Sequence, residues 1–262
     1  MFSIIVPTYN RAPVLQNALA AMLRMDGIAE CELIVVDDGS TDKTPLLLEG
    51  LASQHPGLVR AVRQKNAGPG MARNTGLSLA TQDYILFLDD DVFPEPGLLR
   101  AHTQFLHQGF DLSQGMLAWH PELADSWIVS YMDEHGMQFA FDKVTDDHNL
   151  SYLYVYTANL AVKRDKLIAV GGFDPAFAAK RYAFEDTALA FACVQAGYTL
   201  GFNRAAFALH YHPITAEELI AREYKVGYAT GVLREYYPRI AADLGLYRPG
   251  TLHRAVTFAL GI

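Results

Sequence analysis

The sequence predicts an α/β fold with a parallel sheet in its N-terminal half. Four short runs of aliphatic and β-branched residues lie within residues 1–90, and segments of helical periodicity separate them. Runs that are apolar at successive positions are typical of strands buried on both faces of a sheet. The 262 residues contain no internal repeat, low-complexity tract or Ser/Gly linker, so we expect one compact unit with two lobes.

In the first half, strands are expected at residues 2–6, 33–36, 58–62 and 84–88. After the first strand, apolar residues recur at the i, i+4, i+8 spacing of one helix face: Val14, Leu15, Ala18, Leu19, Met22 and Leu23. Ser40 or Thr41 is expected to cap a second helix that has Pro45 in its first turn. The pattern over residues 70–80 predicts a third helix.

The pattern of the second half is less regular. Helical spacing predicts helices over residues 124–140, 184–196 and 216–236. Strands are expected over residues 152–162, 199–203 and 206–211, and the composition of residues 171–175 indicates a loop.

Charge and cysteine content exclude several classes of protein. The net charge of −8 argues against nucleic acid as a partner, because a protein that binds nucleic acid needs Lys and Arg to neutralise the phosphates. The two cysteines, Cys31 and Cys193, exclude a disulfide framework and a four-cysteine zinc site, and we expect both to be buried, reduced thiols. We see no signal peptide at residues 1–7 and no apolar window of spanning length, so a cytoplasmic location is expected.

A polar segment follows each of the four predicted N-terminal strands. These segments are residues 7–11, 37–40, 65–70 and 89–91. Sheets of this type bind ligands beyond the carboxyl ends of their strands. We therefore expect the four segments to meet along one edge of the sheet and to form a binding site.

The three consecutive aspartates Asp89, Asp90 and Asp91 are the strongest chemical signal. Left alone at the end of a buried strand, three carboxylates would repel one another, and Mg²⁺ or Mn²⁺ prefers carboxylate ligands together with substrate phosphates. The alternative is a solvated turn in which one aspartate caps the helix after Pro94. The three aspartates follow an apolar strand directly, at its carboxyl end, and this position favours a cation-binding site over a solvated turn.

Two further segments have a structural as well as a functional interpretation. The acids and serine of residues 37–40 are ordinary helix caps, or they belong to a nucleotide pocket. The run NAGPGMARNTG at residues 66–76 matches neither the dinucleotide fingerprint nor the P-loop, which argues against NAD. Arg73, close to a helix start, is placed to meet a phosphate or a base.

Candidate proton-transfer and metal-binding residues lie in the second half. Glu185 and Asp186 open a predicted helix, where acids are stabilised by the helix dipole, or they supply a general base beside a cleft. Strand alternation places His210 and His212 on the same face, as structural histidines or as metal ligands.

Taken in order, seven motifs resemble family 2 glycosyltransferases of the GT-A fold. They are VPTYNR (6–11), VVDDGSTDKT (35–44), NAGPGMARNTGL (66–77), FLDDD (87–91), GGFDP (171–175), FEDTALA (184–190) and LHYHP (209–213). The resemblance covers residues 1–235 and implies a Rossmann-like nucleotide-binding half with a mixed sheet (1–110). It also implies a smaller acceptor-side half (111–213) and a helical extension (214–262).

The resemblance also implies an activity. A family member transfers a sugar from a nucleotide-diphosphate sugar, here expected to be a UDP-sugar, to an acceptor hydroxyl with inversion at the anomeric carbon. It uses Mn²⁺ or Mg²⁺ and acts on a carbohydrate or lipid-linked acceptor in polysaccharide or glycolipid biosynthesis. The family often has a further acid two residues after the base, where this chain has Ala188.

Residue roles follow from the same resemblance. The nucleotide would be lined by Pro7, Thr8, Tyr9 and Asn10, its base would bond to Asp38, and Arg73 would lie near the base or the diphosphate. Asp89 and Asp91 form the Asp-x-Asp motif. Asp91 would hold the metal, and Asp89 or Asp90 would approach the ribose. Asp186 would be the catalytic base with Glu185 beside it, and His210 or His212 would complete the metal ligands.

Two other functions remain as alternatives, and the C-terminal region has two interpretations. A non-catalytic nucleotide- or glycan-binding protein would carry the same pocket. An aspartate-dependent phosphatase would need Thr or Val two positions after the second aspartate, where Phe93 stands. Residues 213–262 form either a helix packed on the transferase domain or an amphipathic surface at the inner face of the membrane or on a partner. The oligomeric state is left open.

Overall fold

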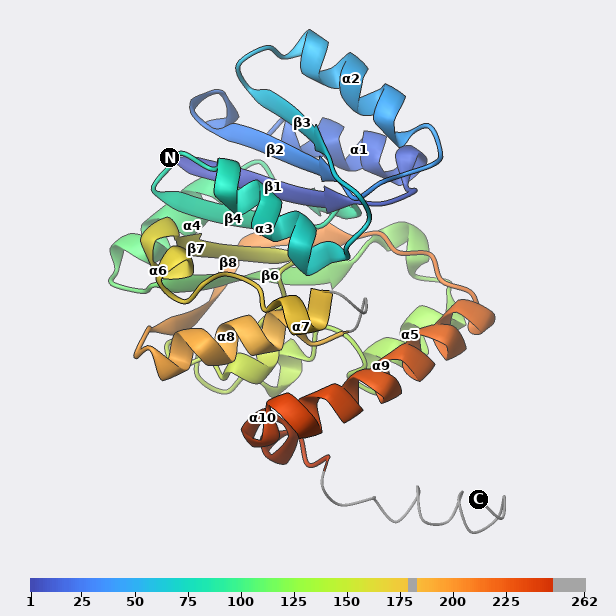
Figure 1. The fold of residues 1–262 in the computed structure, drawn as a ribbon, viewed down its shortest axis with the longest axis vertical. Coiled ribbons are helices and arrows are strands. Elements are labelled where there is room, and N and C mark those ends of the chain that lie inside the picture. The colour runs from blue at the N-terminus through green and yellow to red at the C-terminus, as the bar shows by residue number, and fades with distance from the viewer. Residues whose placement is uncertain (179–182, 247–262) are drawn as a thin grey trace.

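A computed structural model describes residues 1–178 and 183–246, and its centre is a mixed eight-stranded sheet (Figure 1). The strand order is β3-β2-β1-β4-β7-β6-β8-β5. The first four neighbours run parallel, β7 is antiparallel to β4 and β6, β8 is parallel to β6, and β5 is antiparallel to β8. The strands are β1 (Phe2–Thr8), β2 (Glu32–Asp37), β3 (Val59–Arg63), β4 (Tyr84–Leu88), β5 (Val92–Pro94), β6 (Leu112–Trp119), β7 (Asn159–Lys163) and β8 (Leu200–His210).

Helices cover both faces of this sheet, with α3 crossing the near face in Figure 1 and α1 lying behind. The longer helices are α1 (Ala12–Met22), α2 (Thr44–Gln54), α3 (Pro69–Leu79), α4 (Leu98–His107), α5 (Trp127–Glu134), α8 (Glu185–Gln195) and α9 (Ala216–Tyr236). The short ones are α6 (Arg164–Ala169), α7 (Pro175–Ala178), α10 (Pro238–Asp243) and 3₁₀ turns at Ile28–Glu30, Pro121–Leu123, Phe141–Lys143 and Tyr152–Tyr154.

The α/β prediction and the four N-terminal strands are confirmed. Every residue of β1 is buried, as expected for a strand covered by helices on both faces. The predicted apolar face of α1 is buried through Leu15, Ala18, Leu19 and Met22. Long, strongly periodic segments of this kind depend little on distant residues, which is why the pattern identified them.

Four predictions of local structure are corrected. Neither Ser40 nor Thr41 caps α2, which begins at Thr44 without a side-chain cap, although Pro45 does lie in its first turn. The helix expected over 124–140 is limited to α5. The strand expected over 152–162 is a 3₁₀ turn followed by β7, because only residues from Asn159 onward pair with β4. The two strands expected over 199–211 are one, β8, with a pairing irregularity opposite Gly115 and Met116.

The sequence interpretation missed β6 because polar residues interrupt its apolar pattern. Ser113 and Gln114 are buried in the sheet. Ser113 Oγ bonds to His102 Nδ1 at 2.9 Å, and His102 Nε2 lies 3.0 Å from Asn159 Oδ1. Each of these buried polar groups therefore has a partner within the core, a condition that no alternation of apolar and polar residues along one strand can reveal.

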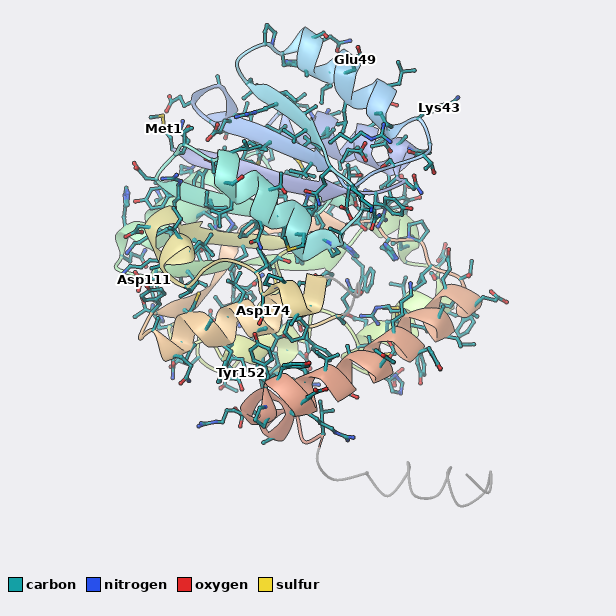
Figure 2. The ribbon with its side chains drawn as sticks, in the orientation of Figure 1. Met1, Lys43, Glu49, Asp111, Tyr152 and Asp174 are labelled. Atoms are coloured by element: carbon teal, nitrogen blue, oxygen red, sulfur yellow. The ribbon has the colours of Figure 1, made fainter. Side chains whose placement is uncertain are left out.

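The C-terminal helices pack onto the rest of the fold. Helix α9 has the bounds that its periodicity predicts, and Thr215 and Glu218 form a capping box at its start. Val232, Leu233, Ile240 and Ala241 pack against Phe177 and Ala188. Asp174 accepts a hydrogen bond from Tyr237, and Tyr152 donates one to Asp243; Figure 2 labels Asp174 and Tyr152 next to these helices.

Two smaller expectations have mixed outcomes. Cys193 is buried, but Cys31 is only partly so, and both thiols are free. Among residues 1–178 and 183–246, no helix combines the length and the apolar character that a membrane crossing requires. Residues 247–262 of the expected helical extension lie outside the described residues.

Candidate active site

The four polar segments meet at one edge of the sheet, as the sequence predicts. Strands β1 and β4 pair in parallel, so the residues after both strands emerge side by side. They enclose a cavity of about 390 Å³. Its lining takes members from all four segments: Pro7, Thr8, Tyr9, Arg11, Asp38, Asn66, Gly68, Pro69, Asp89, Asp90 and Asp91, together with Arg73 and Glu185.

Asp38 holds the loop that forms one wall of this cavity. Its carboxylate accepts hydrogen bonds from Gln64 Nε2, Ala67 N and Gly68 N, each at 2.8 Å. Gly68 has a φ of 95° and precedes the first turn of α3, a backbone conformation that glycine tolerates best. The carboxylate therefore fixes the entry of α3, and it also lines the cavity.

Asn10 fixes the loop after β1, whose neighbouring residues Tyr9 and Arg11 line the cavity. Its φ of 55° is in the left-handed region, which asparagine adopts more readily than most residues. Its side-chain oxygen accepts hydrogen bonds from Thr41 N at 2.7 Å and Asp42 N at 3.3 Å. Asn10 thus ties the loop after β1 to the loop after β2, and it leaves the neighbouring Tyr9 41% exposed at the cavity.

Asp90 is buried beneath the cavity and bonded to β1. Thr8 Oγ1 donates to Asp90 Oδ2 at 2.6 Å, and Arg11 Nε lies 3.5 Å from Asp90 Oδ1. Burial and the neighbouring carboxylates of Asp91 and Asp89 raise the pKa of Asp90 to about 7 against the lowering effects of Arg11 and Thr8.

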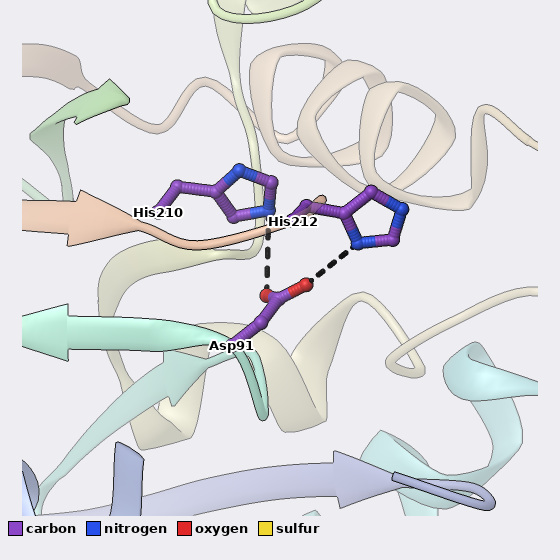
Figure 3. Close-up of side chains that lie close together, drawn as sticks. All are labelled: Asp91, His210 and His212. Carbon is purple, nitrogen blue, oxygen red and sulfur yellow. Dashed lines mark hydrogen bonds and ion pairs between the residues drawn. The ribbon is translucent and has the colours of Figure 1, made fainter. Parts of the chain in front are cut away.

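Asp91 lies between the two histidines, as Figure 3 shows. His210 Nε2 is 3.3 Å from Asp91 Oδ1, and His212 Nδ1 is 3.0 Å from Asp91 Oδ2. Burial favours the neutral acid, but His210, His212 and Arg11 outweigh it and hold the pKa of Asp91 well below its ordinary value. Both predicted histidines therefore reach the aspartate cluster, His210 from the end of β8 and His212 from the loop beyond it.

Arg73 joins the aspartate cluster to the acids of α8. Its guanidinium lies 2.7 Å from Asp89 Oδ1 through Nη2 and 3.3 Å from Glu185 Oε1 through Nη1. The side chain is only 4% exposed, and its Nε has no hydrogen-bond partner in the described structure. The arginine therefore lies behind the carboxylates and orients them, rather than standing free at the cavity mouth.

Glu185 and Asp186 stand at the start of α8, in a strained local geometry. The preceding Phe184 has a φ of 79°, which costs a non-glycine residue about 1 kcal/mol or more. Burial and then the charge of Asp186 raise the pKa of Glu185 to about 7. Burial also raises the pKa of Asp186, whose Oδ1 accepts a bond from Thr187 N at 2.8 Å.

A second cavity of about 620 Å³ adjoins the first. The two share Arg73, Asp89 and Glu185 in their linings, while Asp186 lines only the second. The rest of that lining includes the aromatic residues Phe139, Tyr154, Tyr156 and Phe184. The acids of α8 therefore separate one polar chamber from one that is partly aromatic.

The sequence interpretation gave no role to the aromatic residues around His210 or to Arg11. Trp119 and Phe139 lie edge-to-face against the His210 ring, with centroids 5.2 and 5.0 Å away. Both come from segments that were not expected to approach β8. Arg11 lies within the VPTYNR motif, so its place after β1 was an available signal.

The donors around Asp91 suit a divalent cation. Within the described residues, Asp91, His210 and His212 each offer a ligand atom, and these atoms lie within 4.8 Å of one another. The buried Nδ1 of His210 has no hydrogen-bond partner there, so no acceptor fixes which ring nitrogen carries the proton. A carboxylate with two imidazoles, and further carboxylates nearby, is a donor set that accepts Mn²⁺.

Fold and site together define a GT-A protein. A mannosyltransferase from Pyrobaculum calidifontis, solved with GDP-Man and Mn²⁺, superposes with a TM-score of 0.64 at 24% identity, over 82% of this chain and 58% of that one. S. aureus TarS 1–349 with UDP-GlcNAc gives 0.63 at 20% identity, over 83% and 60%. GalNAc-T7 with UDP, GalNAc and Mn²⁺ gives 0.63 at 15% identity, over 82% and 43%.

The chain belongs to the family described as glycosyl transferase family 2, whose model matches residues 3–170. It is 37% identical to the minor teichoic acid biosynthesis protein GgaA of Bacillus subtilis over 40% of this chain and 25% of that protein. It is 26% identical to the pre-mycofactocin glycosyltransferase of Mycobacterium tuberculosis over 88% and 48%. The chain thus spans half or less of the length of these curated relatives.

Proposed function

We propose that this protein transfers a sugar from a nucleotide-diphosphate sugar to an acceptor hydroxyl, with inversion at the anomeric carbon. The observation that carries the proposal is the pair of adjoining cavities with carboxylates at their junction. The first cavity suits the nucleotide and its diphosphate, and the second suits the acceptor. A UDP-sugar is the expected donor, although the structural relatives include complexes with both GDP-Man and UDP-GlcNAc.

The first cavity supports donor binding through its walls. Tyr9 offers an exposed ring for stacking, and the loop that Asp38 holds lines the cavity through Asn66, Gly68 and Pro69 at the start of α3. Helix starts favour anions because their first N–H groups are unpaired. The proposed roles of Pro7, Thr8 and Asn10 are to shape this cavity, which Thr8 does through Asp90 and Asn10 through the loop after β2.

Asp91, with His210 and His212, would hold the divalent cation, and Asp89 and Asp90 lie beside it. When bound, such a cation stabilises the negative charge that develops on a leaving diphosphate. Asp90 bonds to Thr8, and Asp89 bonds to Arg73 at the junction of the cavities. Asp89 is therefore better placed than Asp90 to face the ribose or the sugar.

Asp186 is the proposed general base. It lines the acceptor-side cavity, whereas Glu185 is paired with Arg73. Burial raises the pKa of Asp186, which brings the basicity of its carboxylate closer to what removal of a hydroxyl proton needs. A base in one cavity and a leaving group in the other place attack and departure on opposite sides of the sugar, which is the geometry of inversion.

The setting we propose is polysaccharide or glycolipid assembly, with a carbohydrate or lipid-linked acceptor. The similarity to GgaA, a minor teichoic acid biosynthesis protein, supports this class of product. The aromatic residues of the second cavity also support it, because aromatic rings bind the apolar faces of sugars.

The test is a donor-turnover screen over common UDP- and GDP-sugars with and without Mn²⁺. Asp186→Asn should retain nucleotide binding but reduce turnover at least about a hundredfold, and Asp91→Ala should lose the Mn²⁺-dependent gain in nucleotide affinity. Asp147→Asn, an acid paired with Arg204 on the surface, is the matched control and should behave as the wild type.

Near-normal turnover by Asp186→Asn would remove that residue from the role of general base. Nucleotide binding without turnover of any donor would favour a binding protein.

A further inference from the structure

Arg11 contacts two of the groups that form the candidate metal site. Its Nη2 atom lies 2.8 Å from Asp91 Oδ2 and 3.0 Å from His212 Nδ1, and those two atoms are themselves 3.0 Å apart. The arginine is the last residue of the VPTYNR motif and the N-cap of α1, and its side chain is 29% exposed. The three atoms form a nearly equilateral triangle at the floor of the first cavity.

Arg11 donates to the carboxylate, because a guanidinium has only N–H groups. Asp91 Oδ2 accepts from Arg11 Nη2. His212 Nδ1 lies within hydrogen-bond distance of both groups: in one tautomer it accepts from Arg11, and in the other it donates to Asp91. In either tautomer, Oδ2 and Nδ1 lie against the same cationic nitrogen.

An oxygen and a ring nitrogen arranged this way also suit two adjacent ligand positions around a metal ion. Ligands at right angles, each roughly 2.1 Å from an octahedral cation, lie about 3.0 Å apart. This is the separation of His212 Nδ1 and Asp91 Oδ2. The guanidinium thus lies against the same two atoms that a divalent cation would bind, and the two cations exclude each other.

We propose that Arg11 is an internal counter-cation that competes with the divalent metal for Asp91 and His212. The inference rests on the proposed function, because it assumes that this site takes a metal. Metal entry displaces the guanidinium, and the solvent-exposed part of the side chain gives it room to move. Since Arg11 lines the donor cavity, the displaced guanidinium remains beside the proposed diphosphate, an anion that it binds well.

The competition has a measurable consequence in the absence of any donor. Arg11 holds the site in a charge-compensated state, so Mn²⁺ alone binds the wild type weakly. In Arg11→Gln the two ligand atoms are released, and Mn²⁺ affinity should rise at least about tenfold, since the variant removes a unit charge in direct contact with the ligands. Arg11→Lys retains the charge and should stay close to the wild type.

The experiment is a titration of each full-length protein with Mn²⁺ alone, followed by the electron paramagnetic resonance signal of free Mn²⁺. Arg63→Gln is the matched control, because Arg63 pairs with Asp37 outside the site and its loss changes the net charge equally. Adding Asp91→Asn to Arg11→Gln should abolish the gain. Circular dichroism confirms that each variant is folded.

The outcomes separate the inference from the proposed function. Tighter Mn²⁺ binding by Arg11→Gln but not by Arg63→Gln supports the competition. Unchanged or weaker binding by Arg11→Gln, in a protein whose wild type turns over a donor with Mn²⁺, overturns the competition and leaves the function standing. If neither protein binds Mn²⁺ through Asp91, both the inference and the metal-assisted function are wrong.

Discussion

Replacing Asp38 by alanine separates two roles for one carboxylate. The family resemblance assigns Asp38 to the base of the nucleotide, whereas the structure shows its carboxylate bonded to Gln64, Ala67 and Gly68, each at 2.8 Å. If the carboxylate mainly holds the loop, Asp38→Ala lowers the free energy of unfolding, and nucleotide affinity falls as a consequence. If it mainly binds the base, only the nucleotide affinity falls.

The size of the effect on the fold follows from the bonds lost. The backbone N–H groups of Ala67 and Gly68 lose a charged acceptor, which costs about 1–3 kcal/mol each. The side-chain amide of Gln64 can form a hydrogen bond with water instead, at little cost. We expect the free energy of unfolding to fall by about 3 kcal/mol in Asp38→Ala. Asp38→Asn keeps one acceptor oxygen and should lose about half as much.

Urea unfolding gives the stability of each variant, and calorimetry with UDP gives its affinity. The expected order of stability is wild type, Asp38→Asn and then Asp38→Ala, with affinity falling in the same order. The reasoning is refuted if Asp38→Ala unfolds at the wild-type urea concentration and yet binds UDP at least about tenfold more weakly, because the carboxylate would then act on the nucleotide alone.

Two other predictions concern charge burial and packing. Burial and Asp186 raise the pKa of Glu185 from 4.5 to about 7, so the folded protein holds that proton more tightly and stability is lost as the pH rises through this window. In urea unfolding at several pH values, Glu185→Gln should remove the Glu185 share of this slope and gain up to about 3 kcal/mol at pH 8, while Asp90, whose pKa is also raised to about 7, keeps its own share. In Gly76→Ala, the new Cβ would lie 2.4 Å from Ile5 Cγ2, and thermal unfolding should show a loss of about 1–3 kcal/mol.

Each of these has its own control. A Glu185→Gln variant with the wild-type dependence of stability on pH would show that another group titrates in this window. For the packing prediction, Gly50→Ala is the partner variant, because Gly50 lies in α2 with open space around it. It should gain about 0.5–1 kcal/mol from its helix propensity. A Gly76→Ala protein as stable as Gly50→Ala would mean that α3 shifts freely on β1.

The N-terminal half was predictable because its signals are local. Each apolar run there is a strand, buried except in the edge strand β3, and the rule that ligands bind at the carboxyl ends of strands brought four polar segments together correctly. The same rule says nothing about the partner of a side chain. The family resemblance made Asp38 a candidate contact of the base, and three donors on its own side of the cavity already bond to its oxygens.

The second half was harder because its decisive contacts link distant segments. Arg73 and Glu185 are 112 positions apart, and Arg11 and His212 are 201 apart. No periodicity or spacing along the chain encodes such pairs. The strand β6 was missed for a related reason, since Ser113 looks like a surface residue until the histidine that bonds to it from α4 is known.

Charge balance explains why these distant arginines belong to the site. Two arginines, Arg11 and Arg73, are the cations in the lining of the first cavity, and they face five acids: Asp38, Asp89, Asp90, Asp91 and Glu185. Burial raises the pKa of Asp90 and Glu185 to about 7, and even with both of these acids protonated the other three acids outnumber the two arginines. A nucleotide diphosphate adds further negative charge. It can therefore bind strongly only if positive charge enters with it, and Asp91 with His212 is where the structure provides the ligands for a cation.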